Sequence, residues 1–144
     1  MPTGSRSDPY ANFRFLVEID SLVVAGFAEV TGIQAETETE EYREGGVNDH
    51  VHKFPRLTRY PNLVFKRGLT ESAELWNWYG NVVDGRVQRK NGAILLVDRT
   101  GEPAWRWEFV QAYPVKWTGP DLRGDGNATA IETLELVHNG LRKA

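Results

Sequence analysis

Between Trp105 and Trp117 the sequence places aromatic or branched side chains at alternate positions, and this pattern restricts the fold more than any other stretch. The alternation is carried by Trp105, Trp107, Phe109, Tyr113, Val115 and Trp117, with Arg106 and Glu108 in between. Successive side chains of a β-strand point to opposite faces, so a period of two predicts a long strand with one buried face. We therefore expect the core of the fold to lie against this strand.

The segment from Ala130 to Val137 carries apolar residues on both faces of a predicted strand. Ala130, Leu134 and Leu136 take the even positions, and Ile131 and Val137 take the odd ones. One face is expected to pack on the core of the domain. Because proteins seldom leave such a surface exposed, another subunit is a candidate for the cover of the second face.

Shorter strands are predicted elsewhere. Apolar and charged residues alternate over 13–20, and residues 61–68 form a short apolar segment after a tyrosine. Asn91-Gly92 is a strong signal for a hairpin turn, so residues 86–98 are expected to form a hairpin. Residues 98–103 (DRTGEP) form a second turn that leads into the aromatic strand.

One helix is predicted between residues 69 and 85. Thr70 is the expected cap, and Glu71 and Glu74 lie in the first turn, where the helix dipole favours anions. Asp84-Gly85 is expected to end the helix. Its buried stripe is predicted to consist of Leu69, Ala73, Trp76 and Val83, widened by Leu75 and Tyr79.

These elements together predict a mainly β fold. We expect an antiparallel β-barrel or sandwich of about seven or eight strands with one α-helix packed on its side. The chain has 144 residues, which is enough for one domain with its own core. Residues 1–12 are polar and rich in glycine and proline and are expected to form a flexible N-terminal arm, whereas residues 13–144 form a single β domain.

Composition argues against several classes of function. The chain has no cysteine, which excludes disulfides and cysteine-based zinc sites, and its formal net charge of −3 argues against strong binding to nucleic acid. No apolar run approaches the ~18 residues of a membrane span, so we expect no membrane insertion. No signal peptide opens the chain, so we expect synthesis in the cytoplasm.

Residues capable of chemistry form no recognisable site in the sequence. His50 and His52 follow Asp49, yet a metal ion needs a third and usually a fourth ligand, and none is marked. No serine lies in a G-x-S-x-G turn, and neighbouring glutamates are more typical of a solvated or interface face than of an acid–base pair. We expect no catalytic residue, no metal and no cofactor. A hydrolase that uses Glu38 or Glu40 is the competing enzymatic hypothesis.

Two segments carry opposite charge. Residues 36–44 contain five glutamates and one arginine in a threonine-rich, strand-like stretch, whereas residues 53–67 contain five basic residues and no acid. Residues 45–60 show little periodicity and predict a long loop, which in a small domain is usually functional. Two interpretations are open. The segments neutralise each other within one subunit, or the acidic edge of one subunit docks on the basic segment of the next.

Seven pieces of the sequence, taken in order, resemble one family. They are FAEVTGI, EEYREGGVNDHVHKFP, YPNLVFKRGLT, LWNWY, ILLVDRTGEPAWRWEF, AYPVKWTGP and AIETLELVHNGL. The resemblance extends over nearly the whole chain from Phe13 to Leu141. The ordered set is similar to the tail-tube protein family of contractile phages and of extracellular contractile injection systems. The resemblance rests on the set and not on any single piece.

The resemblance implies a structural role. Members of this family fold as a β-barrel or sandwich with one helix, close into six-fold rings, and stack into a hollow tube inside a contractile sheath. Strands of each subunit line the lumen, so Glu36, Glu38 and Glu40 are expected to line the lumen or an interface. A loop after the first strands reaches the neighbouring ring, which implies inter-subunit contacts at Gly45, Gly46, Asn48, Asp49, His50, His52, Lys53, Arg56 and Arg59.

The resemblance also implies partners. These are further copies in hexameric rings, the sheath protein, the baseplate or spike hub, the tube cap, and a cargo of DNA or effector protein in the lumen. The protein would then be part of a phage tail or an injection particle. A tube-initiator or baseplate adaptor ring of the same fold is the alternative role. A monomeric β-barrel that binds a small apolar ligand is a more remote alternative and would account for the five tryptophans.

Overall fold

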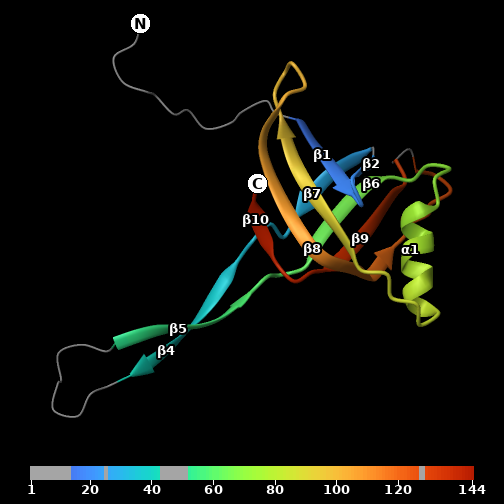
Figure 1. The fold of residues 1–144 in the computed structure, drawn as a ribbon. Helices are drawn as coiled ribbons and strands as arrows, with labels where there is room; N and C mark the ends of the chain where they lie inside the picture. Colours follow the sequence, from blue (N-terminus) through green and yellow to red (C-terminus); the bar gives the residue numbers. More distant parts are fainter. Residues whose placement is uncertain (1–13, 25, 43–51, 127–128) are drawn as a thin grey trace, which may run out of the picture.

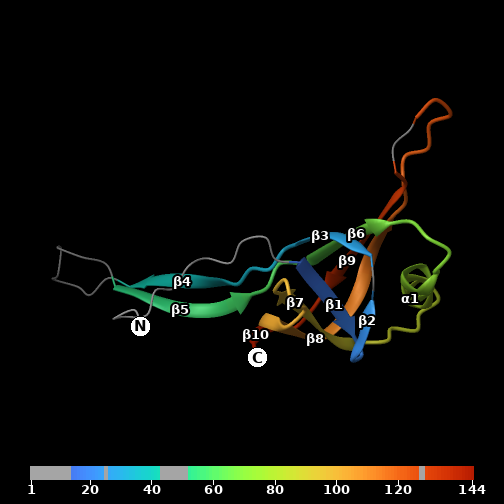
Figure 2. The ribbon, with the colours of Figure 1, turned by 90° about the horizontal axis from the view of Figure 1, so that it is seen from above.

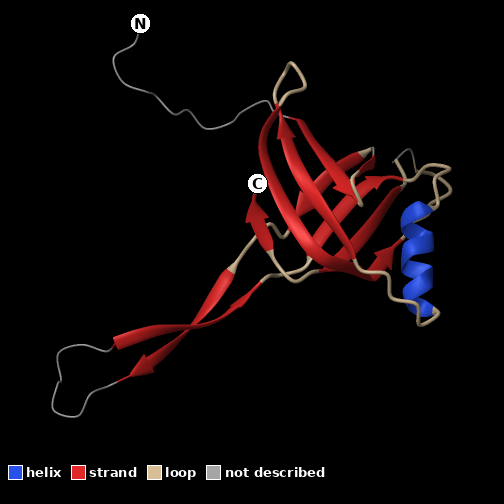
Figure 3. Cartoon of the chain, in the orientation of Figure 1, coloured by secondary structure: helices blue, strands red, loops and turns tan. Residues whose placement is uncertain are grey.

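The computed structural model describes residues 14–24, 26–42, 52–126 and 129–144, so the predicted N-terminal arm lies outside the described residues. Within them the chain forms antiparallel strands and one α-helix (Figures 1 and 3). The elements in order are β1 (Arg14–Ile19), β2 (Leu22–Val24), β3 (Phe27–Thr31), β4 (Glu36–Tyr42), β5 (His52–Arg59), β6 (Leu63–Gly68), α1 (Glu74–Val83), β7 (Lys90–Val97), β8 (Pro103–Thr118), β9 (Ile131–Val137) and β10 (Leu141–Lys143).

Most strands belong to one curved sheet, which we call the barrel. Its strands are paired in the order β2-β1-β7-β8-β9-β6-β3, with β10 added beside β8. The path curls around the core, so that β3, β6 and β9 lie across from β1, β2 and β7, while β4 and β5 form a separate pair that extends away (Figures 1 and 2). The predicted fold class, a mainly β domain with one helix at its side, is confirmed.

Strand β8 joins the two halves of the barrel, because its first part pairs with β7 and its last part with β9. Gln111 separates these parts: its backbone has a φ of 55° and it lies where the register to β7 shifts, in a β-bulge. Before the bulge Phe109 is buried, and after it Ala112 and Pro114 are buried. The predicted alternation is therefore correct as far as Phe109 and wrong for Tyr113 and Val115, because the bulge changes which side chains face the core. A second register shift between Pro114 and Lys116 brings Trp117 back against the core, as predicted.

Asn91 stabilises this bulge and does not form a turn. Its side-chain oxygen accepts a hydrogen bond of 3.0 Å from the Gln111 N–H, and its backbone oxygen accepts one of 2.9 Å from the Asp20 N–H. Asn91 and Gly92 thus lie inside β7, and the predicted hairpin around them is wrong. The turn chemistry of the dipeptide is overridden by the pairing of β7 with strands on both sides.

The predicted turn at residues 98–103 is confirmed as the connection from β7 to β8. The Asp98 carboxylate accepts hydrogen bonds from the Thr100 hydroxyl and from the backbone N–H groups of Thr100 and Glu102. The hydroxyl of Thr100 makes the largest contribution to lowering the pKa of Asp98 below its usual value, and the backbone bonds add to it.

The core lies between the two halves of the barrel. Phe65 and Phe109 meet there with their ring centroids 6.2 Å apart. The side chains that share this space and are almost fully buried are Val17, Leu63, Ile94, Leu134 and Leu136. The even-numbered positions of β9 face this core, whereas Ile131 and Val137 are half-buried, so the second face of β9 is only partly covered within the described chain.

Helix α1 is shorter than predicted and buries a different side. It begins after Ala73 without a side-chain cap, because the Thr70 hydroxyl accepts a hydrogen bond from the Ser72 N–H instead, and Glu71 precedes the helix. Residues Leu75 and Trp78 are buried, and the Trp78 indole N–H donates to the Gln88 carbonyl at 2.9 Å.

The main positions of the predicted stripe are consequently wrong, whereas the residues predicted to widen it, Leu75 and Tyr79, do pack against the core. Leu69, Trp76 and Val83 are exposed, and the Trp76 and Trp117 rings are in edge contact with their centroids 4.6 Å apart. The helix is too short for the spacing of its apolar residues to show which face is buried. The packing of Trp78 against the barrel decides which face of the helix points inward. The helix ends at Asp84, as predicted.

Gly92 lies where a ring and a neighbouring strand pack closely against the backbone of β7, and this generates a stability prediction. A side chain at this position would collide with the Phe109 ring and the Glu18 carbonyl, so Gly92→Ala is expected to lower the free energy of unfolding by about 1–3 kcal/mol. Gly80→Ala is the matched control, because that site in α1 has open space and alanine favours a helix by up to about 1 kcal/mol. Urea unfolding of both variants checks this; equal effects would contradict it.

Candidate assembly surface

Strands β4 and β5 form a two-stranded hairpin, which we call the arm, and it extends from the barrel on the side opposite α1 (Figures 1 and 2). Glu36 pairs with Arg59 at its root and Tyr42 with His52 at its far end. The hydroxyls of Thr37 and Thr58 lie 3.0 Å apart across the strands. The predicted long loop is therefore wrong for residues 52–59, which form a strand because β4 supplies the backbone partners.

The arm leaves the barrel through a fixed joint. Gly32 follows β3 with a φ of 92°, and a side chain there would collide with the Asn62 carbonyl. Ile33, the next residue, packs against the core. Only glycine fits this combination of backbone conformation and close approach. The direction of the arm is thus set at its root by the barrel.

The opposite charges of the two predicted segments meet within one subunit. Arg59 forms an ion pair with Glu38, and Arg56 lies 4.0 Å from Glu40. Lys53 is directly opposite Glu41 in the register. These pairs are largely exposed, so each contributes only about 0–1 kcal/mol, and their charged groups remain accessible to a further partner.

Apolar side chains of the arm are also exposed. Tyr42, Phe54 and Leu57 each leave more than half of their surface uncovered. The Tyr42 and Phe54 rings are in edge contact with centroids 6.3 Å apart, and the His52 ring lies 6.4 Å from that of Phe54. A two-stranded hairpin is at best marginally stable in water, and grouped exposed apolar residues mark an interaction surface. The arm is therefore the part of this chain that most requires a partner.

All of the predicted contact residues that can be placed lie on this arm. They are Glu36, Glu38 and Glu40 on β4 and His52, Lys53, Arg56 and Arg59 on β5. Gly45, Gly46, Asn48, Asp49 and His50 lie outside the described residues. In the described part of the chain no group of three or more histidine, aspartate or glutamate side chains could hold a metal ion, and no helix is long and apolar enough to cross a membrane.

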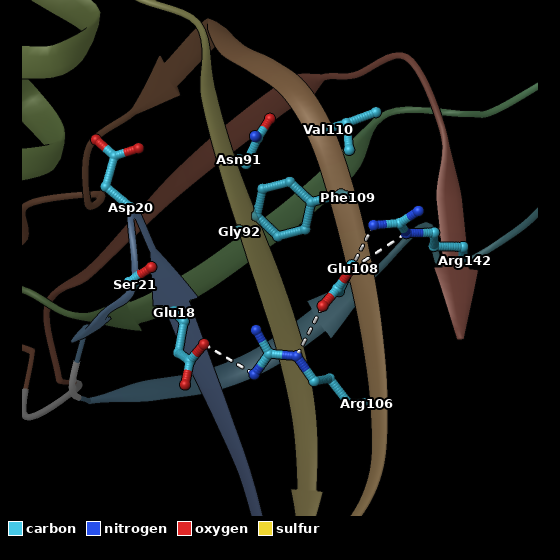
Figure 4. Close-up of a pocket in the computed structure, with 10 residues that line it drawn as sticks. All are labelled: Glu18, Asp20, Ser21, Asn91, Gly92, Arg106, Glu108, Phe109, Val110 and Arg142. Carbon is cyan, nitrogen blue, oxygen red and sulfur yellow. Dashed lines mark hydrogen bonds and ion pairs between the residues drawn. The ribbon is translucent and has the colours of Figure 1, made fainter. Parts of the chain in front are cut away.

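A chain of alternating charges lies in a polar hollow of about 440 Å³ on the outside of the barrel (Figure 4). The Arg106 guanidinium donates to Glu18 at 2.9 Å and to Glu108 at 3.2 Å, and Arg142 on β10 reaches Glu108 at 3.2 Å. Hydrogen bonding to Glu18 raises the pKa of Arg106, and hydrogen bonding from Arg106 lowers the pKa of Glu108. The charges satisfy one another and connect β1, β8 and β10.

A second charged group is buried and was missed by the sequence analysis. Arg67 on β6 and Glu132 on β9 are directly opposite in the register, with Nε and Oε2 3.5 Å apart and side-chain exposures of 4% and 2%. Arg67 also bonds Glu74 of α1 at 3.1 Å, and the Trp117 indole N–H donates to Glu132 at 3.3 Å. The group attaches the helix to the barrel. Its only signal in the sequence was that Glu132 shares a strand face with Leu134 and Leu136.

Removal of one member of the buried pair should be costly. Glu132→Gln is expected to lower the free energy of unfolding by about 3–5 kcal/mol, because the Arg67 charge stays buried without its counter-ion. The double variant Arg67→Met/Glu132→Leu should recover most of that loss. Glu74→Gln is the exposed control, with an expected cost of about 0–1 kcal/mol. A double-mutant cycle of Arg67→Met, Glu132→Leu and the double variant, measured by urea unfolding, gives the coupling; additive effects would contradict it.

The pKa of Glu108 predicts a dependence of stability on pH. Since this pKa is lower in the folded than in the unfolded protein, the unfolded state takes up the proton first as pH falls below the usual value of 4.5. The urea concentration at the midpoint of unfolding is expected to decrease as the pH falls from 4.5 to below the pKa of Glu108 in the folded protein. Arg106→Gln should flatten this part of the pH profile. An unchanged profile in the variant would contradict the assignment.

Comparison with known proteins identifies relatives over nearly the whole chain. The family model of the T4-like virus tail tube protein gp19 matches residues 11–142. The chain is similar to a protein of the anti-feeding prophage baseplate, with 26% identity, coverage of 96% of this chain and 97% of that chain, and a TM-score of 0.82. No curated protein matches significantly.

Two further structures support the same fold. A protein of the PVC sheath–tube complex in the extended state, from an extracellular contractile injection system, has 25% identity, coverage of 94% and 91%, and a TM-score of 0.85. Hcp1 from Flavobacterium johnsoniae has 18% identity, coverage of 90% and 93%, and a TM-score of 0.61, a likeness of fold alone.

Proposed function

The chain belongs to the T4-like virus tail tube protein gp19 family, and from this premise we propose that it is the repeating subunit of an inner tube. In this proposal the copies form hexameric rings, and the rings stack around a lumen inside a contractile sheath. Particles of both phage-tail and injection-system type would suit such a subunit. The role is structural, and it involves no catalytic residue and no cofactor.

The observation that carries the proposal is the arm. It carries exposed aromatic side chains beyond the reach of the barrel, and a hairpin of two strands needs further packing to be stable. In the described chain β2 and β3 also end the sheet path with one unpaired edge each. Unpaired edges and exposed apolar groups are what association with further copies would cover.

The proposed partners follow from this role. Besides further copies they are the sheath protein, the baseplate or spike hub, and the tube cap, with DNA or an effector protein as cargo in the lumen. The similar structures come from a baseplate, a sheath–tube complex and a sheath/tube terminator, which supports this set. We propose that the protein is made in the cytoplasm and assembled there into the particle.

The same evidence favours one alternative role. The similar protein from a baseplate is matched over 96% of this chain, which supports, as a second candidate, the initiator ring on which a tube grows. A repeating subunit forms tubes of many rings by itself, whereas an initiator stops at one ring. The ligand-binding barrel is less well supported, because Phe65, Phe109 and their neighbours fill the interior of the described barrel.

The proposal is tested by negative-stain microscopy of the purified protein over a range of concentrations. We expect six-fold rings and stacked tubes at high concentration. Protein that stays monomeric at every concentration would refute the proposal, and single rings that never stack would favour the initiator role.

Charge reversal tests the residues of the arm. Glu38→Lys/Glu40→Lys and Lys53→Glu/Arg56→Glu are each expected to reduce ring stacking, because charge complementarity sets the register of an interface. The reversal Arg99→Glu, on the exposed turn between β7 and β8, is the control. Normal stacking after both arm reversals would remove these side chains from the interface.

A further inference from the structure

We infer that the hollow between β2 and α1 receives Phe54 from the arm of a second copy. The inference rests on the proposed function and extends it, because it names the surface that each arm contacts. It follows from the shape and chemistry of two surfaces on the same chain.

The hollow lies at an open edge of the sheet and combines an apolar floor with polar groups around it. It has a volume of about 380 Å³, and its floor includes the buried side chains of Leu75 and Trp78. Its wall on the β2 side consists of Leu22 and Val23, which are 71% and 56% exposed. Exposed aliphatic side chains beside a preformed hollow with an apolar floor are typical of a surface that a partner covers.

The rim of the hollow is charged. The Asp20 and Glu74 carboxylates lie there together with Lys90. The Lys90 ammonium is 3.7 Å from Asp20 and lies 5.2 Å from the centroid of the Trp78 ring. Glu74 bonds the buried Arg67 but remains half exposed, so its carboxylate faces solvent at the edge of the hollow.

The arm offers a matching group. Phe54 is 52% exposed and lies between the basic residues Lys53 and Arg56 along β5. Arg56 is 4.0 Å from Glu40, and both are more than half exposed, so its guanidinium remains able to bind a second carboxylate. An aromatic anchor in an apolar pocket with charges at the rim is the usual centre of a protein interface.

The placement of the two surfaces excludes contact within one copy. The arm and α1 lie on opposite sides of the barrel in both views (Figures 1 and 2). A contact between two different surfaces of one chain repeats from copy to copy, and it builds rings or open stacks. This is the type of contact that the proposed tube needs.

Two other hollows in the described part of the chain fit Phe54 less well. The one around Arg106 is lined mainly by charged groups that already satisfy one another, and an aromatic ring would desolvate them. The hollow of about 230 Å³ at the root of the arm includes Trp107 and Leu141, but Arg142 and Lys143 at its edge carry the same charge as Lys53 and Arg56.

Engineered cysteines provide a direct test, because the natural chain contains none. Leu57→Cys on the arm is mixed with a tagged Leu22→Cys variant under conditions in which the wild type assembles, and disulfides are then formed by mild oxidation. Both positions are exposed, so the fold should tolerate the changes. The matched control mixes Leu57→Cys with tagged Lys143→Cys, at the hollow beside the root of the arm.

We expect the cross-linked heterodimer with Leu22→Cys and little with Lys143→Cys. The reverse preference, or equal yields, would overturn the inference while leaving the tube function intact. Absence of any assembly in the wild type would instead refute the proposed function, and this inference with it.

The anchor itself is tested on the same assemblies. Phe54→Ala is expected to raise the concentration needed for assembly by about thirtyfold or more, as for truncation of an aromatic anchor, and Phe54→Leu should raise it less. Leu122→Ala, at an exposed position outside the hollow, is the control. An unchanged assembly threshold for Phe54→Ala would overturn the inference.

Discussion

The structure depends on one strand that serves two halves of a barrel. Strand β8 pairs with β7 before Gln111 and with β9 after it, and the left-handed backbone at Gln111 lets its core-facing side change between the two parts. The Asn91 side chain holds that bulge by accepting a hydrogen bond from the Gln111 N–H. Without the change, Ala112 and Pro114 could not face the core that Phe109 faces. The curvature that encloses Phe65 and Phe109 follows from this arrangement.

The same features explain what the sequence could and could not predict. The alternation from Trp105 to Phe109 predicted the central strand, because local periodicity reports a buried face. The alternation could not predict the bulge at Gln111, because a positive φ is expected at glycine and this position is a glutamine. The threonine-rich pattern indicated a strand at β4, but residues 52–59 gave no strand signal, because β5 lacks an apolar core face and its pairing depends on backbone bonds to β4. Helix α1 was oriented wrongly because Trp76 and Trp78 are equally apolar.

The sequence predicted the charged residues of the candidate surface but not its exposed aromatic residues. Glutamates 36–40 and the basic residues of β5 were expected at an interface, and the structure places them on one arm, where several pair with each other. What distinguishes the arm, however, is its exposed Phe54 and Tyr42, which the sequence analysis did not single out. A lone aromatic in a polar stretch gives no periodic signal. Its significance appears only when the neighbouring barrel is seen not to cover it.

The joint at Gly32 has a consequence for the kinetics of assembly. Its backbone conformation, its contact with the Asn62 carbonyl and the packing of Ile33 define the angle at which the hairpin projects before any second molecule arrives. A binding element that is preorganised in its bound orientation loses less conformational entropy on association. More of its encounters can then lead directly to a bound state, which raises the rate at which each added molecule is captured by a growing end.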